Sequence, residues 1–270
     1  MKTRILSAIV AIAVFIGVVY FLPQICFTVA ISVILAIGAY ELVWRSKIVS
    51  SFPMLVTSCA FAAAFPFVVS LPDAPAYIFV LMFSCLVVLF TIWLFNFGKV
   101  SLVMMLTSFF AGAVIPLLFS FIVPIRLMEN GQYMLLFPFV AAWMTDTGAY
   151  FAGSFFGRHK LCEKISPKKT VEGAVGGVIT CIISVFAFAK IMEGTFEMTV
   201  NYPVVLCGAL VLSVIAQIGD LSFSIIKREY NIKDYGAIMP GHGGVLDRFD
   251  STIFTIPASY ILLILLGGIL

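Results

Sequence analysis

Long apolar stretches, separated by short polar segments, run through the whole chain. There are nine, at residues 5–22, 24–43, 52–71, 76–97, 101–123, 133–156, 171–191, 203–226 and 252–270. Most approach the roughly 20 residues that an α-helix needs to cross the hydrocarbon core of a bilayer. The pattern therefore predicts an all-α fold, a polytopic integral membrane helical bundle with about nine transmembrane helices.

Composition supports this prediction. Hydrophobic residues make up 62% of the chain and charged residues 11%, whereas a soluble domain carries about 25% charged residues. No linker or convincing repeat divides the sequence, so we expect residues 1–270 to form a single membrane domain. Lys2 and Arg4 precede the first stretch as in a signal peptide, but the stretch lacks a small-residue cleavage site and is expected to remain as an anchor.

The basic residues predict the orientation. If the amino terminus is cytoplasmic, every Lys and Arg except Arg126 and Lys190 falls in a cytoplasmic segment, as the positive-inside rule requires. The carboxyl terminus is then expected on the opposite side. A nucleic-acid partner is excluded because there is no basic soluble module. The six cysteines form no CxxC pair and mostly fall inside apolar stretches, so we expect them to pack rather than to form disulfides or bind zinc.

Ionisable residues inside apolar stretches are functional candidates, because a charge in a bilayer is costly. The first five stretches hold little polarity, and Glu41 lies close to a cytoplasmic helix end. Asp146 lies within the sixth stretch, with Tyr150 on the same helix face. We interpret Asp146 as functional, with a buried hydrogen-bond partner for a neighbouring helix as the alternative. Glycine pairs at 153/157 and 173/177 are typical of close helix packing.

A basic segment joins the sixth and seventh stretches. Ser166 followed by Pro167 is a typical helix start, which would place Lys168 and Lys169 in the first helical turn. Backbone N–H groups there attract anions, so the segment suits a bound phosphate. Contact with anionic lipid headgroups is the alternative.

The eighth stretch carries a polar stripe. Its members recur every three or four residues, at Ser213, Gln217, Asp220, Ser224 and Lys227, and therefore share one helix face. Such a face is expected to line a bundle interior or a cavity rather than to meet lipid.

A glycine-rich segment follows. His242 stands between Gly241 and the pair Gly243 and Gly244, and glycine permits close approach of a ligand to the backbone. Carboxylates and cations alternate around it, at Asp220, Lys227, Arg228, Lys233, Asp234, Asp247, Arg248 and Asp250. Carboxylates beside cations suit a Mg²⁺ ion that carries phosphates.

This last part of the chain closely resembles the signature of the phosphatidate cytidylyltransferases, or CDP-diacylglycerol synthases. The matching positions are Ser224, Lys227, Arg228, Lys233, Asp234, His242, Gly243, Gly244, Asp247, Arg248 and Asp250. Met239 departs from the usual Leu, Ile or Phe, and segments 146–153 and 166–173 resemble two further family segments. The resemblance thus covers the second half, so we expect residues 131–270 to be the catalytic half and residues 1–130 to supply mainly scaffold, dimer-facing and lipid-facing spans.

The resemblance implies transfer of a cytidylyl group from CTP to phosphatidic acid at the cytoplasmic face of the cell membrane. It also implies a homodimer and dependence on Mg²⁺, with a monovalent cation such as K⁺ as a second candidate. Asp220 and Asp247 are the expected metal ligands. Catalysis is expected from Ser224, Lys227, Arg228, His242, Arg248 and Asp250, and substrate binding from Asp146, Tyr150, Lys168, Lys169, Lys233, Asp234, Gly243 and Gly244.

Other functions remain as alternatives at this point. A transporter of an anionic substrate would also have a buried polar stripe, although here the charges gather at one side. A CTP-dependent lipid or polyprenol kinase would use the same nucleotide. The DG…AR…G…D…D pattern of the CDP-alcohol phosphotransferases is absent.

Overall fold

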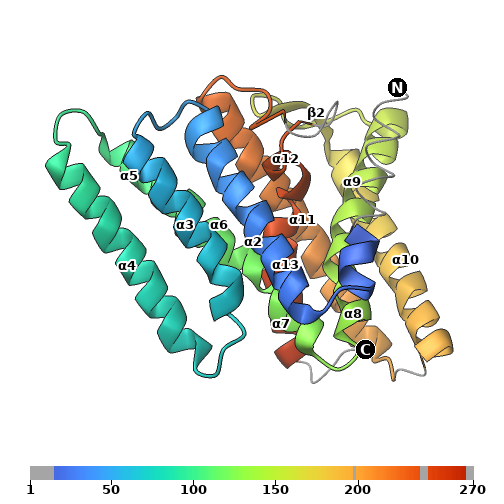
Figure 1. Ribbon diagram of the computed structural model, residues 1–270. Coiled ribbons are helices and arrows are strands. Elements are labelled where there is room, and N and C mark those ends of the chain that lie inside the picture. The colour runs from blue at the N-terminus through green and yellow to red at the C-terminus, as the bar shows by residue number, and fades with distance from the viewer. Residues whose placement is uncertain (1–14, 197–198, 238–242, 266–270) are drawn as a thin grey trace. The chain divides into compact units, whose positions relative to one another are not determined.

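The computed structural model describes residues 15–196, 199–237 and 243–265. They are mainly helical (Figure 1), and the helices coincide with the predicted stretches from the second to the ninth. Residues 15–20 of the first stretch are helical, and the rest of that stretch before them lies outside the described residues. The chain divides into two compact units. Unit 1 comprises Met1–Leu127 and Tyr230–Phe249, and unit 2 comprises Met128–Glu229 and Asp250–Leu270.

Unit 1 consists of consecutive helices from the first part of the chain and one short helix from its last part. They are α2 (Gln24–Tyr40), continued by a π-helical turn η1 (Glu41–Arg45), then α3 (Phe52–Val68), α4 (Ala74–Phe95), α5 (Leu102–Phe109), η2 (Phe110–Val114), α6 (Ile115–Ser120), α7 (Ile122–Leu127) and the short α12 (Leu246–Phe249). The α3 helix packs between α2 and α4 (Figure 1). It also packs on η2, where Gly112 permits close contact because a Cβ there would lie 2.8 Å from Ser58 Cα.

Unit 2 contains longer helices and a hairpin. Its elements are α8 (Gly131–Met134), α9 (Leu136–Phe156), β1 (Lys160–Cys162), β2 (Ser166–Thr170), α10 (Val171–Phe196), α11 (Tyr202–Glu229) and α13 (Thr252–Leu265). Helix α9 packs along α10, and α11 contacts α9, α10 and α13. The glycine spacing in α10 has the predicted effect, since a Cβ on Gly177 would lie 2.8 Å from Thr145 O of α9.

The hairpin corrects the predicted helix start at Ser166. Strands β1 and β2 pair antiparallel, with Cys162 opposite Ser166, so Lys168 and Lys169 lie on a strand. Helix α10 begins four residues later than a Ser166 cap requires, and Thr170 caps it by accepting the Gly173 N–H at 3.1 Å. Both Ser and Thr are good cap residues, and the strand pairing with residues 160–162 leaves Thr170 as the cap. This arrangement also keeps both lysines out of the helical turn, where the dipole disfavours cations.

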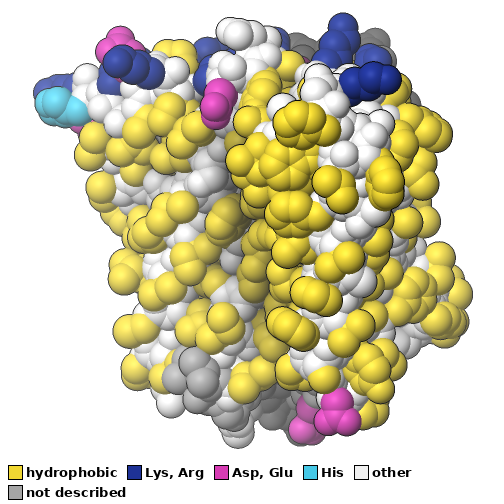
Figure 2. All heavy atoms as spheres, turned by 90° about the vertical axis from the view of Figure 1, so that its left-hand side faces the viewer, with side chains coloured by type: hydrophobic (Ala, Val, Ile, Leu, Met, Phe, Trp, Pro, Cys, Tyr) yellow, Lys and Arg dark blue, Asp and Glu magenta, His cyan; other side chains and the backbone are white. Residues whose placement is uncertain are grey.

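Among the described residues, five helices are long and apolar enough to cross a membrane. They span Gln24–Arg45, Ala74–Phe95, Leu102–Leu127, Val171–Phe196 and Tyr202–Glu229, and two shorter apolar helices span Phe52–Val68 and Thr252–Ile264. Figure 2 views the molecule from the α4 side, where hydrophobic side chains cover the surface between charged ends. An exposed apolar surface of this kind suits contact with lipid. All six cysteines are free; Cys85 and Cys181 are buried, whereas Cys26 and Cys207 are exposed and so do not fit the prediction that the cysteines pack inside the protein.

Candidate active site

The polar stripe of α11 faces the interior of unit 2, as predicted. Ser213 is fully buried and hydrogen-bonds to Thr145 of α9 at 2.9 Å. Gln217 donates to Ala174 O of α10 at 3.3 Å. Further along, Ser224 donates a long hydrogen bond of 3.5 Å to Asp220, and Lys227 is buried. Along α11, the stripe therefore begins with uncharged side chains that hold helices together, such as Ser213, and ends with charged side chains, such as Lys227.

Lys169 of β2 forms an ion pair with Asp220 of α11. Their side chains are 27% and 23% exposed, so the pair is shielded from bulk water but open on one side. The hairpin is held against both neighbouring helices. Glu172 of α10 accepts the backbone N–H groups of Arg158 and His159 at 3.1 and 3.2 Å. These contacts place two lysines of the hairpin next to the polar stripe.

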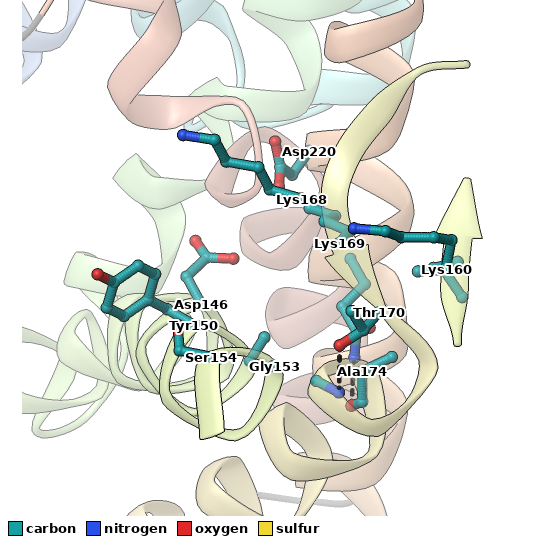
Figure 3. A pocket seen from close by; sticks show the side chains of 14 residues that line it. Asp146, Tyr150, Gly153, Ser154, Lys160, Lys168, Lys169, Thr170, Ala174 and Asp220 are labelled. Carbon is teal, nitrogen blue, oxygen red and sulfur yellow. Dashed lines mark hydrogen bonds and ion pairs between the residues drawn. The ribbon is translucent and has the colours of Figure 1, made fainter. Parts of the chain in front are cut away.

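A cavity of about 470 Å³ opens beside this ion pair. Its lining combines α9, the hairpin, α10 and α11, and includes Asp146, Tyr150, Gly153, Ser154, Lys160, Lys168, Lys169, Thr170, Ala174, Gln217 and Asp220. Figure 3 shows the Asp146 carboxylate pointing from α9 into this space, toward Lys168 and Asp220 on the other side. Five residues predicted to be functional from separate parts of the sequence therefore line one cavity.

Asp146 is exposed to this cavity. Its carboxylate accepts a hydrogen bond from Ser251 Oγ at the long distance of 3.5 Å. A carboxylate that served only to hold two helices together would be enclosed and closely bonded. The geometry therefore favours the functional interpretation of Asp146 over the packing alternative.

Asp250 lies at the start of the segment that leads into α13. The side chain is buried, and its carboxylate accepts the N–H of Ser251 at 2.9 Å. Its pKa is raised to about 7, first because burial disfavours the charged form and then because the negative charge of Asp220 lies nearby; Lys227 lowers it. Asp146 contributes a further negative charge to the same region. Unit 2 thus holds three carboxylates that repel one another, with Lys169 and Lys227 as cations beside them.

This donor set fits Mg²⁺ held by one or two carboxylates. Within the part of the chain that the structure describes, no three His, Cys, Asp or Glu side chains form a closed metal site. Mg²⁺ does not require one, since it usually keeps water and substrate phosphates as ligands beside one or two carboxylates. A divalent cation near Asp220 would also relieve the repulsion between Asp220 and Asp250, which adds to the effect of burial in raising the pKa of Asp250.

Unit 1 carries the glycine-rich segment as two described arms, which we call the first arm (residues 233–237) and the second arm (residues 243–248). Asp247 of the second arm is buried, and its Oδ2 accepts the N–H groups of Tyr235 at 2.8 Å and of Gly244 at 3.1 Å. A Cβ on Gly243, whose φ is +86°, would lie 3.2 Å from Asp247 Oδ2 and 3.4 Å from Asp234 Oδ1. The two carboxylates therefore approach the same glycine.

The other predicted charged residues of this region are exposed. For Lys233, Asp234 and Arg248, this leaves the charged groups open to a ligand. Arg228 of unit 2 is exposed as well, and its Nε donates to Ile165 O of the hairpin connection at 3.1 Å. His242 lies outside the described residues.

Two residues of interest were not predicted. Lys160 lines the cavity and donates to Pro167 O at 2.7 Å. Glu41 was noted as ionisable, but its contact with the second arm was not foreseen: it accepts N–H groups of Val245 and Leu246. The charge of Glu41 inside an apolar stretch was the available signal for it, whereas nothing distinguished Lys160 from the other basic residues of its loop.

Known proteins similar to this chain share the expected chemistry. A model of the cytidylyltransferase family matches residues 2–266. The phosphatidate cytidylyltransferase of Bacillus subtilis is 34% identical over 276 residues, which cover 98% of each chain. Phosphatidate cytidylyltransferases of Staphylococcus haemolyticus and Staphylococcus aureus are 43% and 45% identical over 136 residues, covering 50% of this chain and 51% of each relative. Because the family model and the Bacillus subtilis enzyme match almost from end to end, the chain belongs to the cytidylyltransferase family.

Proposed function

We propose that this chain is a phosphatidate cytidylyltransferase, a nucleotidyltransferase that converts CTP and phosphatidic acid into CDP-diacylglycerol and pyrophosphate. The observation that carries the proposal is the similarity to the Bacillus subtilis enzyme over 98% of both chains. The cavity of unit 2 supports it, because Lys160, Lys168 and Lys169 offer three cations to anionic substrates.

The reaction mainly requires that the two substrates are correctly positioned and that the negative charge of their phosphates is neutralised. An oxygen of the lipid phosphate attacks the α-phosphorus of CTP, and the bond from that phosphorus to the oxygen bridging to the β-phosphate breaks. Pyrophosphate leaves with the electron pair of that bond. Since the nucleophile is already anionic, no strong general base is needed. Binding, orientation and electrostatic stabilisation then supply most of the rate.

The residues of unit 2 are assigned on this basis. Lys168 is exposed on the cavity side of the hairpin and binds a substrate phosphate. Lys169 neutralises Asp220 before substrate binds, and a phosphate would take over as its partner. In unit 2 Asp220 would hold Mg²⁺, which would neutralise charge on the phosphates. Asp250, buried nearby, adds negative charge to that site.

The second arm supplies the corresponding groups of unit 1. Asp247 is proposed as a Mg²⁺ ligand through a carboxylate that also holds the arm together. Arg248 is exposed and offers a bidentate donor to a phosphate. Gly243 and Gly244 let the backbone approach a nucleotide.

The membrane arrangement is part of the proposal. Nine spans with a cytoplasmic amino terminus account for the distribution of Lys and Arg. The site would then face the cytoplasm, where CTP is dissolved and where phosphatidic acid presents its phosphate. We also propose a homodimer, on the resemblance to the family alone.

Product analysis tests the function directly. The purified protein is incubated with CTP and phosphatidic acid, with and without Mg²⁺, and CDP-diacylglycerol and pyrophosphate are measured. We expect equal amounts of both products with Mg²⁺ and neither without it; replacing KCl by NaCl tests the monovalent cation. Release of CDP with a doubly phosphorylated lipid would identify a kinase. Uptake of an anion into vesicles without either product would identify a transporter.

A further inference from the structure

We propose that Glu41, at the end of the α2 helix, is a positioning residue for nucleotide binding. Its carboxylate holds the backbone of the second arm and so determines where Asp247 and Arg248 lie. The inference rests on the proposed function, in which the second arm binds CTP. Glu41 precedes the arm by about 200 residues in the chain and belongs to the half that sequence alone assigns to the scaffold.

Glu41 is completely buried, with 0% of its surface exposed. It opens the π-helical turn η1, which ends α2, and such turns are frequent at functional sites. Burying a carboxylate is costly unless hydrogen bonds satisfy it. A side chain that served packing alone would be apolar at such a position, so the hydrogen bonds that Glu41 makes must account for a carboxylate there.

Both carboxylate oxygens bond to the second arm. Oε1 accepts the Val245 N–H at 3.0 Å, and Oε2 accepts the Leu246 N–H at 2.9 Å. Leu246 begins the four-residue helix α12, whose first N–H groups have no partner inside the helix. Glu41 therefore satisfies two adjacent N–H groups directly before Asp247.

Glycine allows both arms to close around this carboxylate. A Cβ on Gly244 of the second arm would lie 2.5 Å from Glu41 Oε2, and a Cβ on Gly236 of the first arm would overlap Oε1. Any larger residue at either position would displace the carboxylate or the arm. Two glycines from different arms thus mark the same contact.

Asp247 completes the arrangement. Its Oδ2 joins Tyr235 of the first arm to Gly244 of the second, and Tyr235 is fully buried. Glu41 and Asp247 together hold the internal backbone of the arms, while Arg248 and Asp234 stay exposed. Without Glu41, the peptide before Asp247 loses two charged hydrogen bonds, and the groups offered to CTP lose their fixed position.

The test uses Glu41→Gln, which keeps the shape but turns one acceptor into a donor that faces a backbone N–H. We expect the KM for CTP to rise about 10- to 100-fold, the range expected for one lost charged hydrogen bond. The KM for phosphatidic acid should stay within about twofold. Amide hydrogen exchange measured without substrate should accelerate in residues 243–248 and stay unchanged in α9 and α10.

Two further variants make the outcome decisive. Gly236→Ala reaches the same contact from the first arm, so it should raise the KM for CTP similarly, and the double variant should cost less than the product of the two effects. Ser32→Ala is the matched control, because Ser32 is buried on the same helix and its hydroxyl makes no hydrogen bond among the described residues. Its kinetics and exchange should equal those of the wild type.

An unchanged KM for CTP together with unchanged exchange in residues 243–248 would overturn the inference. So would an equal rise in both KM values, which indicates a general structural defect. If Glu41→Gln is not recovered from the membrane, Gly236→Ala is judged by the same criteria. Failure of the wild type to form CDP-diacylglycerol would refute the proposed function instead, and the exchange measurement would still decide the role of Glu41.

Discussion

Gly177 of α10 offers a test of how helix packing positions the cavity. A methyl group added there would lie 2.8 Å from Thr145 O and 3.2 Å from Ala149 Cβ of α9. A carbon needs about 3.3 Å from a carbonyl oxygen, so Gly177→Ala must move α9 and α10 apart by roughly 0.5 Å. Overpacking of this kind costs about 1–3 kcal/mol, of which the better helix propensity of Ala recovers up to about 1 kcal/mol.

The same displacement should reduce activity. Thr145 bonds to Ser213 and directly precedes Asp146, so a shift of α9 moves one wall of the cavity relative to α11. Since misplacement by 1 Å can cost about 100-fold, a shift of roughly half that size should lower kcat/KM about tenfold. The assays are CDP-diacylglycerol formation and thermal inactivation of the detergent-solubilised protein.

Gly194→Ala provides the control on the same helix. Apart from Gly194's chain neighbours and the backbone of its own helix, no atom of the described residues lies within 4 Å of the added methyl group, so the substitution should leave kcat/KM unchanged and leave the thermal midpoint equal or slightly higher. Equal behaviour of the two variants, with Gly177→Ala fully active and as stable as the wild type, would refute the argument that close contact between α9 and α10 positions the cavity.

Three further predictions concern charge. In the absence of Mg²⁺ and CTP, the thermal stability of the wild type should fall as pH rises from about 4 to 8, and Asp250→Asn should make this fall smaller. The reason is that the pKa of Asp250 is raised to about 7, so its ionisation opposes folding, by at most about 4 kcal/mol above pH 7. An identical pH profile in the variant would contradict this. Lys169→Met should lower activity at least 100-fold, and it should lower thermal stability because Asp220 loses its ion-pair partner. Adding Asp220→Asn to this variant should restore thermal stability without restoring activity. Asp247→Asn should remove nearly all activity while hydrogen exchange in residues 243–248 stays protected, because the amide oxygen still accepts both N–H groups; near-normal turnover would refute its role as a metal ligand.

Helix positions and polar faces followed directly from the sequence. The stripe from Ser213 to Lys227 was predicted from spacing alone, and its members do face the interior of unit 2. The pair Gly173 and Gly177 was expected to bring helices close, and both contact α9. These predictions succeeded because they depend on the period of one helix, which neighbouring residues determine.

The hairpin shows where local signals were insufficient. Ser166 was predicted to begin the seventh helix, whereas in the structure residues 166–170 form strand β2 and Thr170 caps the helix. Pairing with Lys160–Cys162 makes this segment a strand, and the hydropathy pattern does not show which segments pair. The position of Lys160 in the cavity depends on the same pairing.

By itself, the sequence determined that the chain is a helical membrane protein, which residues carry charge within it, and which family it resembles. The tertiary structure decided which of those charges meet. Lys169 pairs with Asp220 across 51 residues, and Glu41 bonds to Val245 across 204. A buried charged group needs a partner because burial without one is costly. Which partner lies within reach depends on how distant segments of the chain pack, and this is a property of the whole fold.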